Sequence, residues 1–263
     1  MDIVTITNQK GGVGKTSTTL NLAAALIRRG YKPLVVDLDP QQGNLSQTVG
    51  ADKTQESMFE VLCGDANINE VIQTTKMFDI ATATLDMQGI ESKLNSMSGG
   101  AGREHRLAMA LEDLPEGKYD IVLIDTPPAL DVLTTNALVA SNKVLVVVEA
   151  DVNAMHGMKQ LGEAVSVIRK FYNKDLGYSG ILMTKFQSRT NNGRDMRVVA
   201  EAIGESIGTG VFKTAIRHGV SIPDAMRNQM DAYSWDKESG PAVDYEAFSD
   251  EFIQEMGLQP KTL

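Results

Sequence analysis

Cysteine and histidine are scarce in this sequence: among 263 residues there is one cysteine, Cys63, and there are three histidines. A lone thiol cannot form an internal disulfide. Positive charge is also in short supply, because 25 lysines and arginines stand against 34 aspartates and glutamates, a formal net charge of -9. The chain as a whole is therefore repelled by nucleic acid and by anionic lipid, and a partner of either kind would need a local basic patch.

Long apolar runs are missing as well. No stretch approaches the roughly 20 residues that a membrane span requires, and the N-terminus lacks the basic start, apolar centre and cleavage site of a secretion signal. No repeat and no proline- or serine-rich linker interrupts the chain. We expect a cytoplasmic protein that does not associate with membranes, with one domain covering residues 1–263.

Short apolar runs alternate with longer helical patterns from one end of the chain to the other. Such runs are expected of strands that are covered on both faces, and their alternation with helices is typical of βαβ units. The expected strands are 3–7, 34–38, 121–124, 144–148 and 180–183, and the expected helices are 16–29, 103–114, 156–171, 195–206 and 241–256. The sequence therefore predicts an α/β fold: a doubly wound, mostly parallel sheet with helices on both faces.

A glycine-rich turn, Lys10-Gly-Gly-Val-Gly-Lys-Thr16, joins the first expected strand to the first expected helix. Such a turn directs several backbone N–H groups and the positive helix end at one point. A polyphosphate fits that point: Lys15 can reach its β- and γ-phosphates, and the Thr16 hydroxyl can ligate Mg²⁺. The alternative, a glycine turn without function, does not explain why strand, loop, Lys-Thr pair and helix follow in this order. The candidate nucleotide-binding residues are Lys10, Gly11, Gly12, Val13, Gly14, Lys15, Thr16 and Ser17.

Acidic residues follow two of the expected strands. Asp37 and Asp39 come at the end of one, and Asp125 ends the apolar run 119–125. Open α/β sheets bind ligands at the carboxyl ends of their strands. Asp125 has the Walker B arrangement and is expected to hold Mg²⁺ through a water molecule. Aspartate before proline is by itself an ordinary turn feature, so these carboxylates matter through their combination with the loop.

The loop departs from the usual phosphate-loop pattern, because Gln9 stands where a glycine is expected and Lys10 adds a second lysine. In this it resembles the deviant Walker A motif of the ParA/MinD superfamily of P-loop ATPases. The resemblance implies a nucleotide-sandwich homodimer in which Lys10 reaches the partner's nucleotide. It also implies that Asp39 orients the attacking water, and that Asp37 belongs to the surrounding magnesium and hydrogen-bonding network. The candidate catalytic residues are Lys10, Lys15 and Asp39.

The expected cofactors are ATP and Mg²⁺. No guanine-recognition motif is present, since the Thr-Lys-Phe-Gln stretch at 184–187 fits it poorly. Phosphoryl transfer needs charge neutralisation by lysine and metal together with a positioned water. The lysines, Thr16, Asp39 and Asp125 offer a candidate for each of these parts.

Further stretches, at 136–140, 188–191 and 244–248, resemble the partition ATPases of that superfamily. The segment from Tyr245 to Met256 contains acids and no lysine or arginine, unlike the basic membrane helix of MinD-like proteins. Cys63 alone cannot supply the two cysteines per subunit of nitrogenase-iron-protein relatives. Because the first strand begins at residue 3, we expect the short form without an N-terminal helix-turn-helix. The Ile-Arg pair at 216–217 resembles variants from plasmids and other mobile elements.

Positive charge is concentrated in the last third of the chain. The resemblance implies that the ATP-bound dimer binds double-stranded DNA without sequence preference, through arginines on one face. Arg189 matches a family position, whereas Arg217 stands where chromosomal members have a proline, so it could contact either DNA or adenine. The alternative is a solvated helix face balanced by neighbouring acids. The candidate DNA-binding residues are Arg189, Arg194, Arg197 and Arg217.

The hypothesis that combines these features is a DNA-partition ATPase. ATP and Mg²⁺ would drive a homodimer that associates with nucleoid DNA, and a ParB-like centromere-binding protein would stimulate the slow hydrolysis that releases it. Two alternatives stay open: a positioning or assembly ATPase that acts on a protein cargo, and a metabolic synthetase of the dethiobiotin-synthetase type that uses the same loop.

Overall fold

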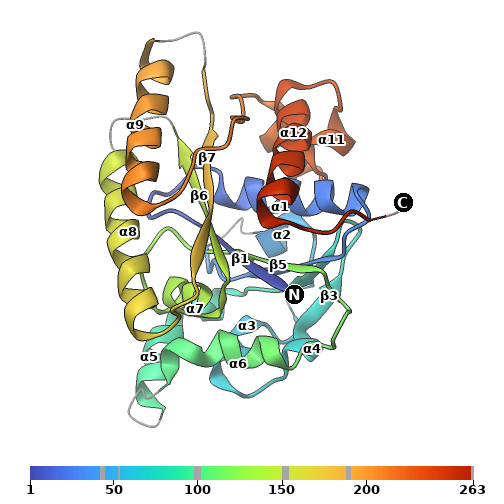
Figure 1. The fold of residues 1–263 in the computed structure, drawn as a ribbon. Helices are drawn as coiled ribbons and strands as arrows, with labels where there is room; N and C mark the ends of the chain where they lie inside the picture. The colour runs from blue at the N-terminus through green and yellow to red at the C-terminus, as the bar shows by residue number, and fades with distance from the viewer. Residues whose placement is uncertain (42–44, 53, 98–101, 150–153, 188–190, 262–263) are drawn as a thin grey trace.

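The computed structural model describes residues 1–263 except 42–44, 53, 98–101, 150–153, 188–190 and 262–263; for 154–156 and 191–194 it describes only the backbone. Within this part of the chain, seven strands form one sheet in the order β3-β4-β2-β5-β1-β6-β7 (Figure 1). Neighbouring strands are parallel, except that β3 runs antiparallel to β4. The strands are β1 (Asp2–Thr7), β2 (Pro33–Asp37), β3 (Ile72–Thr74), β4 (Asp79–Ala81), β5 (Ile121–Asp125), β6 (Lys143–Glu149) and β7 (Gly177–Thr184).

The helices fill the connections between these strands. The longest follow β1, β6 and β7 or close the described chain. In chain order they are α1 (Lys15–Arg28), α2 (Leu45–Thr48), α3 (Met58–Cys63), α4 (Ile68–Val71), α5 (Ile90–Ser96), α6 (Arg106–Glu112), α7 (Val132–Ala140), α8 (Ala154–Phe171), α9 (Asn191–Ile207), α10 (Ser221–Arg227), α11 (Ala232–Trp235) and α12 (Gly240–Met256).

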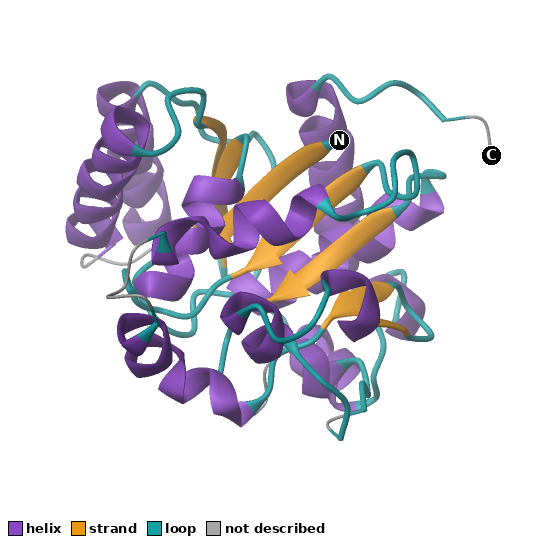
Figure 2. Ribbon diagram, turned by 90° about the horizontal axis from the view of Figure 1, so that it is seen from below, coloured by secondary structure: helices purple, strands orange, loops and turns teal. Residues whose placement is uncertain are grey.

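Helices cover both faces of the sheet (Figures 1 and 2). On one face, Val35 and Leu123 belong to an apolar cluster that α1 and α12 complete. On the other face, Val36 and Ile124 pack against helices between α3 and α7, and Val146 packs in a cluster with α8. Alternate residues of a strand point to opposite faces, so strands covered on both sides need apolar residues at every position. The doubly wound, mostly parallel fold expected from the sequence is confirmed.

The C-terminal helix α12 packs on α1, and its acidic residues pair with two arginines at the end of that helix. Arg28 lies 2.5 Å from Glu246, and Arg29 lies 2.6 Å from Asp250. The acids of this segment therefore stabilise a helix–helix contact within the chain. No helix of the described residues is long and apolar enough to cross a bilayer.

One expectation about an individual element needs correction. The helix expected over 103–114 is a 3-10 turn, Arg103–His105, followed by the shorter α6.

Candidate nucleotide-binding site

The phosphate-loop segment connects β1 to α1, and two of its glycines have left-handed backbone angles. Gly12 has φ +73° and Gly14, the residue before α1, has φ +96°. Side-chain-bearing residues rarely adopt such angles, so these positions need glycine. The hydroxyl of Thr184, at the end of β7, donates a 2.6 Å hydrogen bond to the Val13 carbonyl. This bond ties the loop that follows β1 to the end of the edge strand β7.

The two lysines of the loop already interact with each other. The Lys15 ammonium donates to the Lys10 carbonyl oxygen at 3.4 Å, and Lys15 is only 6% exposed. Burial lowers the pKa of Lys15, and the attraction of Asp125 and Asp39 works in the opposite direction. A buried ammonium whose hydrogen bond to a carbonyl is as long as 3.4 Å is suited to an incoming phosphate.

Asp125 ends β5 beside the last residue of β2, because Asp37 and Asp125 are register partners in the sheet. Asp125 is fully buried. Its Oδ1 accepts a 3.4 Å hydrogen bond from Thr19, whereas its Oδ2 has no hydrogen-bond partner. Burial, and next the proximity of Asp37, raise the pKa of Asp125 to about 8, while a hydrogen bond from Thr16 lowers it. A buried carboxylate oxygen without a partner is the atom that a cation would satisfy.

A magnesium ion fits this position. Within the described residues, no three His, Cys, Asp or Glu side chains are placed to hold a metal on their own. Mg²⁺ commonly takes one or two protein oxygens and completes its shell with water and phosphate. The Thr16 hydroxyl and Asp125 are the residues that would hold it, since they already interact. The ion would supply positive charge for the phosphate oxygens and for Asp125.

Asp37 has a different environment, because its carboxylate is used within the chain. Ser46 donates to Asp37 Oδ2 through its hydroxyl at 2.6 Å and through its backbone N–H at 2.8 Å. The Asp39 N–H donates to Oδ1 at 3.0 Å. Complete burial nevertheless raises the pKa of Asp37 to about 6. Asp37 thus holds the turn after β2 and places Asp39, in keeping with the hydrogen-bonding part of its expected role.

Asp39 lies two residues beyond β2 and is 8% exposed. Its Oδ1 accepts a hydrogen bond from the Gln41 N–H at 3.0 Å. Burial raises the pKa of Asp39, the hydrogen bond from Gln41 and the charge of Lys15 lower it, and Asp131 raises it further. The carboxylate therefore lies near the buried lysine, where it could orient a water molecule against a bound phosphate.

A cavity of about 260 Å³ opens beside the loop. Its lining combines the loop at Gly12 and Ser17 with an apolar wall that includes Ile216, Ile222 and Met226. A flat apolar ring with a polar edge fits such a wall. The sequence did not identify the residues that contact the base. Because the segment 216–226 lies next to the phosphate loop, it is the candidate for that contact.

The expected DNA-contacting arginines lie in different environments. Arg189 falls outside the described residues, and of Arg194 only the backbone is described, in α9. Arg197 donates to Glu201 at 3.1 Å and to the Phe212 carbonyl at 2.9 Å. Arg217 makes two 2.8 Å bonds to Asp244 through its guanidinium. Both described arginines thus have acidic partners in the chain, and their contact with DNA remains a prediction.

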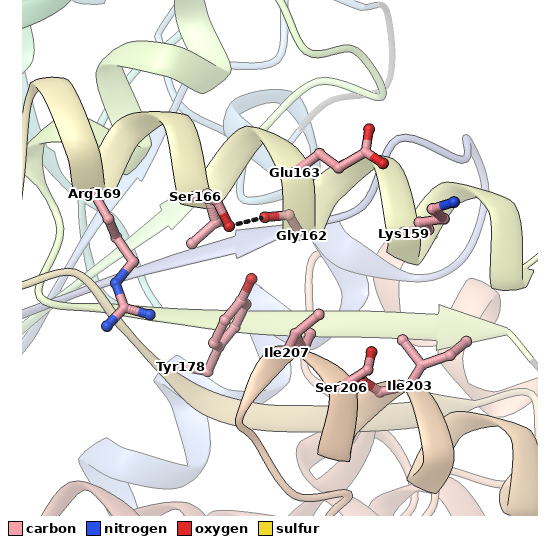
Figure 3. Close-up of a pocket in the computed structure, with 10 residues that line it drawn as sticks. Lys159, Gly162, Glu163, Ser166, Arg169, Tyr178, Ile203, Ser206 and Ile207 are labelled. Carbon is pink, nitrogen blue, oxygen red and sulfur yellow. Dashed lines mark hydrogen bonds between the residues drawn. The ribbon is translucent and has the colours of Figure 1, made fainter.

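A second cleft, of about 810 Å³, is separate from the loop. It lies between α8 and α9 next to Tyr178, the second residue of β7, with Lys159 and Arg169 at its sides (Figure 3). None of its lining residues belongs to the loop or follows a strand's carboxyl end. Ser166 lines it too, but its hydroxyl donates to the Gly162 carbonyl at 2.9 Å. The cleft is therefore no part of the phosphate site.

Several site residues escaped the sequence interpretation. Glu149 ends the apolar strand β6 as Asp125 ends β5, so the same signal of an acid after an apolar run was present. Asp131 precedes α7 and caps it by accepting from Leu133 and Thr134 backbone N–H groups. Ser46 and Thr184 carry no sequence signal of their own, because their partners are brought together only by the fold.

The sheet, the loop and the acids at strand ends define a class: a P-loop nucleotide-binding protein with two lysines in its phosphate loop. Residues 1–178 match the family described as "AAA domain". The sporulation initiation inhibitor protein Soj of Bacillus subtilis (strain 168) is 36% identical over 247 residues, which are 92% of this chain and 94% of that protein. The chromosome partitioning protein ParA of Myxococcus xanthus is 37% identical over 218 residues, 81% of this chain and 72% of that protein.

A solved structure agrees along the whole chain. Cobyrinic acid a,c-diamide synthase from Mycobacterium smegmatis, with bound ADP and magnesium, superposes with a TM-score of 0.83 at 31% identity. The match covers 100% of this chain and 99% of that one. Soj and ParA are likewise similar to this chain over most of its length. The chain belongs to the ParA family of partition ATPases.

Proposed function

We propose that this chain is a DNA-partition ATPase: its ATP-bound homodimer binds double-stranded DNA without sequence preference, and hydrolysis releases it. The observation that carries the proposal is the pair of lysines in one loop: Lys15 is buried near Asp125 and Asp39, whereas the Lys10 side chain is 36% exposed beside it. Similarity to proteins named for chromosome partitioning supports the same proposal. The whole of residues 1–263 acts as one ATPase domain in this proposal.

The chain is an ATPase with ATP and Mg²⁺ as cofactors. The loop from Lys10 to Ser17 binds the phosphates, with Lys15 neutralising charge on the β- and γ-phosphates. Thr16 and Asp125 hold the magnesium ion. Asp39 orients the attacking water, and its place near Lys15 supports this role. Asp37 keeps Asp39 in position.

Lys10 acts across the dimer interface. Its side chain is 36% exposed at the loop, so it is accessible to a second copy, whereas Lys15 is buried beside the acids. Each protomer would place Lys10 on its partner's nucleotide, and the dimer would exist only when ATP is present. Such coupling makes ATP binding and hydrolysis a switch for whatever surface the dimer forms.

DNA is the proposed ligand of that surface, through Arg189, Arg194, Arg197 and Arg217. The in-chain partners of Arg197 and Arg217 would have to be shared with the DNA phosphates or given up when DNA binds. A ParB-like centromere-binding protein would stimulate hydrolysis. We infer a cytoplasmic protein that associates with the nucleoid.

The test is a mobility-shift titration of an arbitrary duplex DNA, with ATP or with ADP. Binding is expected with ATP alone and should fall steeply with salt, because phosphate contacts release counter-ions. Arg189→Ala should weaken it. Lys118→Ala removes one charge from an exposed position just before the amino end of β5, away from the loop at the carboxyl ends of the strands. This control variant should bind DNA as the parent does. Equal binding with ATP and ADP, or an equal loss in both variants, would refute the proposal.

One alternative has a specific observation in its favour. The full-length structural match at 31% identity is to a protein named as a diamide synthase. A synthetase would need a second small-molecule pocket beside the phosphates. The cavity of about 260 Å³ beside the loop is the one already assigned to the nucleotide's base, and the larger cleft lies elsewhere. ATP turnover that needs an added carboxylic acid substrate, with no DNA binding, would favour the synthetase.

A further inference from the structure

Three neighbouring strands place a charged side chain at the same edge of the sheet. Lys10 follows β1, Glu149 ends β6 and Lys185 follows β7, and these strands are adjacent in the order β1-β6-β7. Glu149 Oε2 lies 3.8 Å from the Lys10 ammonium and 3.4 Å from the Lys185 ammonium. One carboxylate thus pairs with two lysines, and one of them is the lysine that the proposed function sends to the partner's nucleotide.

The backbone of Lys10 is anchored, through Asn8, to β6, the strand that Glu149 ends. Its N–H donates to Asn8 Oδ1 at 2.9 Å, and Asn8 Nδ2 donates to the Val147 carbonyl at 2.7 Å. Val147 lies two residues before Glu149. The Lys10 side chain can therefore leave the carboxylate by rotating about its own bonds, while the loop that binds the phosphates stays in place.

Lys185 is held in an unusual conformation at this point. Its φ of +50° is one of two positive values among the described residues other than glycine. A lysine in the left-handed region carries a conformational cost and persists only where its surroundings hold it. Here the adjacent Phe186 is bonded to the Ile216 carbonyl, and the Lys185 ammonium reaches Glu149.

We propose that Glu149 is a positioning residue for Lys10: its carboxylate holds the Lys10 ammonium in the nucleotide-free monomer and competes with the partner's triphosphate for it. This inference rests on the proposed function of Lys10 across the dimer. When Lys10 leaves, Lys185 stays as the counter-ion of Glu149, so the carboxylate is never left alone. Glu149 therefore sets the ATP concentration at which the chain dimerises.

Two substitutions should shift that concentration in opposite directions. Glu149→Gln keeps the side-chain shape and removes the charge, so Lys10 is released more easily and dimerisation needs less ATP. Partly exposed ion pairs of this kind correspond to about a two- to fivefold change in an equilibrium constant. Lys185→Met leaves Glu149 with Lys10 alone, so dimerisation should need more ATP by a similar factor. A gain of function in Glu149→Gln is a result that structural damage does not produce.

The experiment is an ATP titration of the full chain by sedimentation velocity, in an Asp39→Ala background that slows hydrolysis. Glu149→Gln should lower the ATP midpoint for dimer formation and Lys185→Met should raise it. Glu149→Ala serves as a second charge-removing variant, and thermal unfolding checks that each variant is folded. In a Lys10→Ala background the Glu149→Gln change should have no effect on nucleotide binding, because the ammonium that Glu149 restrains is absent.

The outcomes separate the two levels of the proposal. If the Asp39→Ala reference dimerises with ATP and both Glu149 variants keep its midpoint or raise it, Glu149 does not restrain Lys10. If the reference stays monomeric at saturating ATP, the dimer itself is wrong and the inference falls with it. A lower midpoint in both Glu149 variants, together with a higher one in Lys185→Met, supports the exchange.

Discussion

The Lys15 ammonium donates a hydrogen bond to the Lys10 carbonyl oxygen at 3.4 Å. The backbone of one lysine therefore holds the ammonium of the other within the phosphate loop. Because Lys15 is buried and its pKa is lowered by that burial, the nucleotide-free protein stores an unfavourable charge. A bound phosphate would stabilise the Lys15 ammonium. Part of the affinity for ATP therefore comes from this buried charge.

Lys15→Met should abolish measurable ATP binding while the fold is kept. The substitution removes the charge that faces the β- and γ-phosphates, and it also removes a buried ammonium, so stability should stay the same or rise. We expect at least a hundredfold loss in affinity, about 2.7 kcal/mol, in a titration with a fluorescent ATP analogue. Lys118→Met, at an exposed position before β5, is the matched control and should bind as the parent does.

The stability of the nucleotide-free protein should fall as the pH rises. Burial raises the pKa of Asp125 from 3.8 to about 8, so the folded chain holds this proton more tightly than the unfolded chain. The resulting cost is absent below pH 4, grows between pH 4 and 8, and is complete above that range. Asp125→Asn removes the titration. In urea unfolding, the variant should be more stable than the parent at pH 8, with the difference vanishing near pH 4.

Asp120 offers a control of opposite sign for this experiment. Burial raises the pKa of Asp120, but hydrogen bonds from the Lys261 ammonium and the Lys32 backbone N–H, together with the charges of both lysines, outweigh it and lower the pKa. Its contribution to stability is therefore present above about pH 4 and is lost as the pH falls below that. Asp120→Asn should be less stable than the parent at pH 8 and equal to it at low pH. The same trend in both variants would contradict the assignment of Asp125 as the carboxyl that burial disfavours.

Ser46→Ala should separate the turn after β2 from the phosphate loop. The hydroxyl donates to Asp37 Oδ2 and accepts from the Ala83 N–H, so its loss leaves a buried carboxylate short of one donor. We expect about 1–3 kcal/mol of destabilisation and a larger fall in kcat for ATP than in ATP affinity, because Asp39 depends on this turn. Unchanged hydrolysis in a destabilised variant would show that the turn does not position Asp39.

The central strands and the loop could be predicted because their signals are local. β2 and β5 are buried at every position, which apolar runs show directly. β3 and β4 are three residues each, with polar residues at half their positions, so no periodicity marks them. α7 escaped because seven of its nine residues are buried, and a helix buried on nearly all sides lacks the amphipathic pattern that identifies helices on the surface.

Charge pairs show the limit of sequence reasoning at this site. The density of arginine and lysine in the last third of the chain indicated either a DNA-binding face or a face balanced by neighbouring acids. The fold brings Asp244 to Arg217 across 27 residues and Glu149 to Lys185 across 36. Such partners depend on which elements are neighbours in space, and spacing along the chain does not contain that information.

The central claim, that ATP joins two copies of this chain through Lys10, is tested most directly with Asp39→Ala. This variant should bind ATP and hydrolyse it slowly, so that the dimer accumulates. Sedimentation velocity at saturating ATP and Mg²⁺ should then give a dimer, with a monomer in ADP and a monomer in the Asp39→Ala, Lys10→Ala double variant. A chain that binds ATP and stays monomeric, or a dimer that persists without Lys10, would contradict the account.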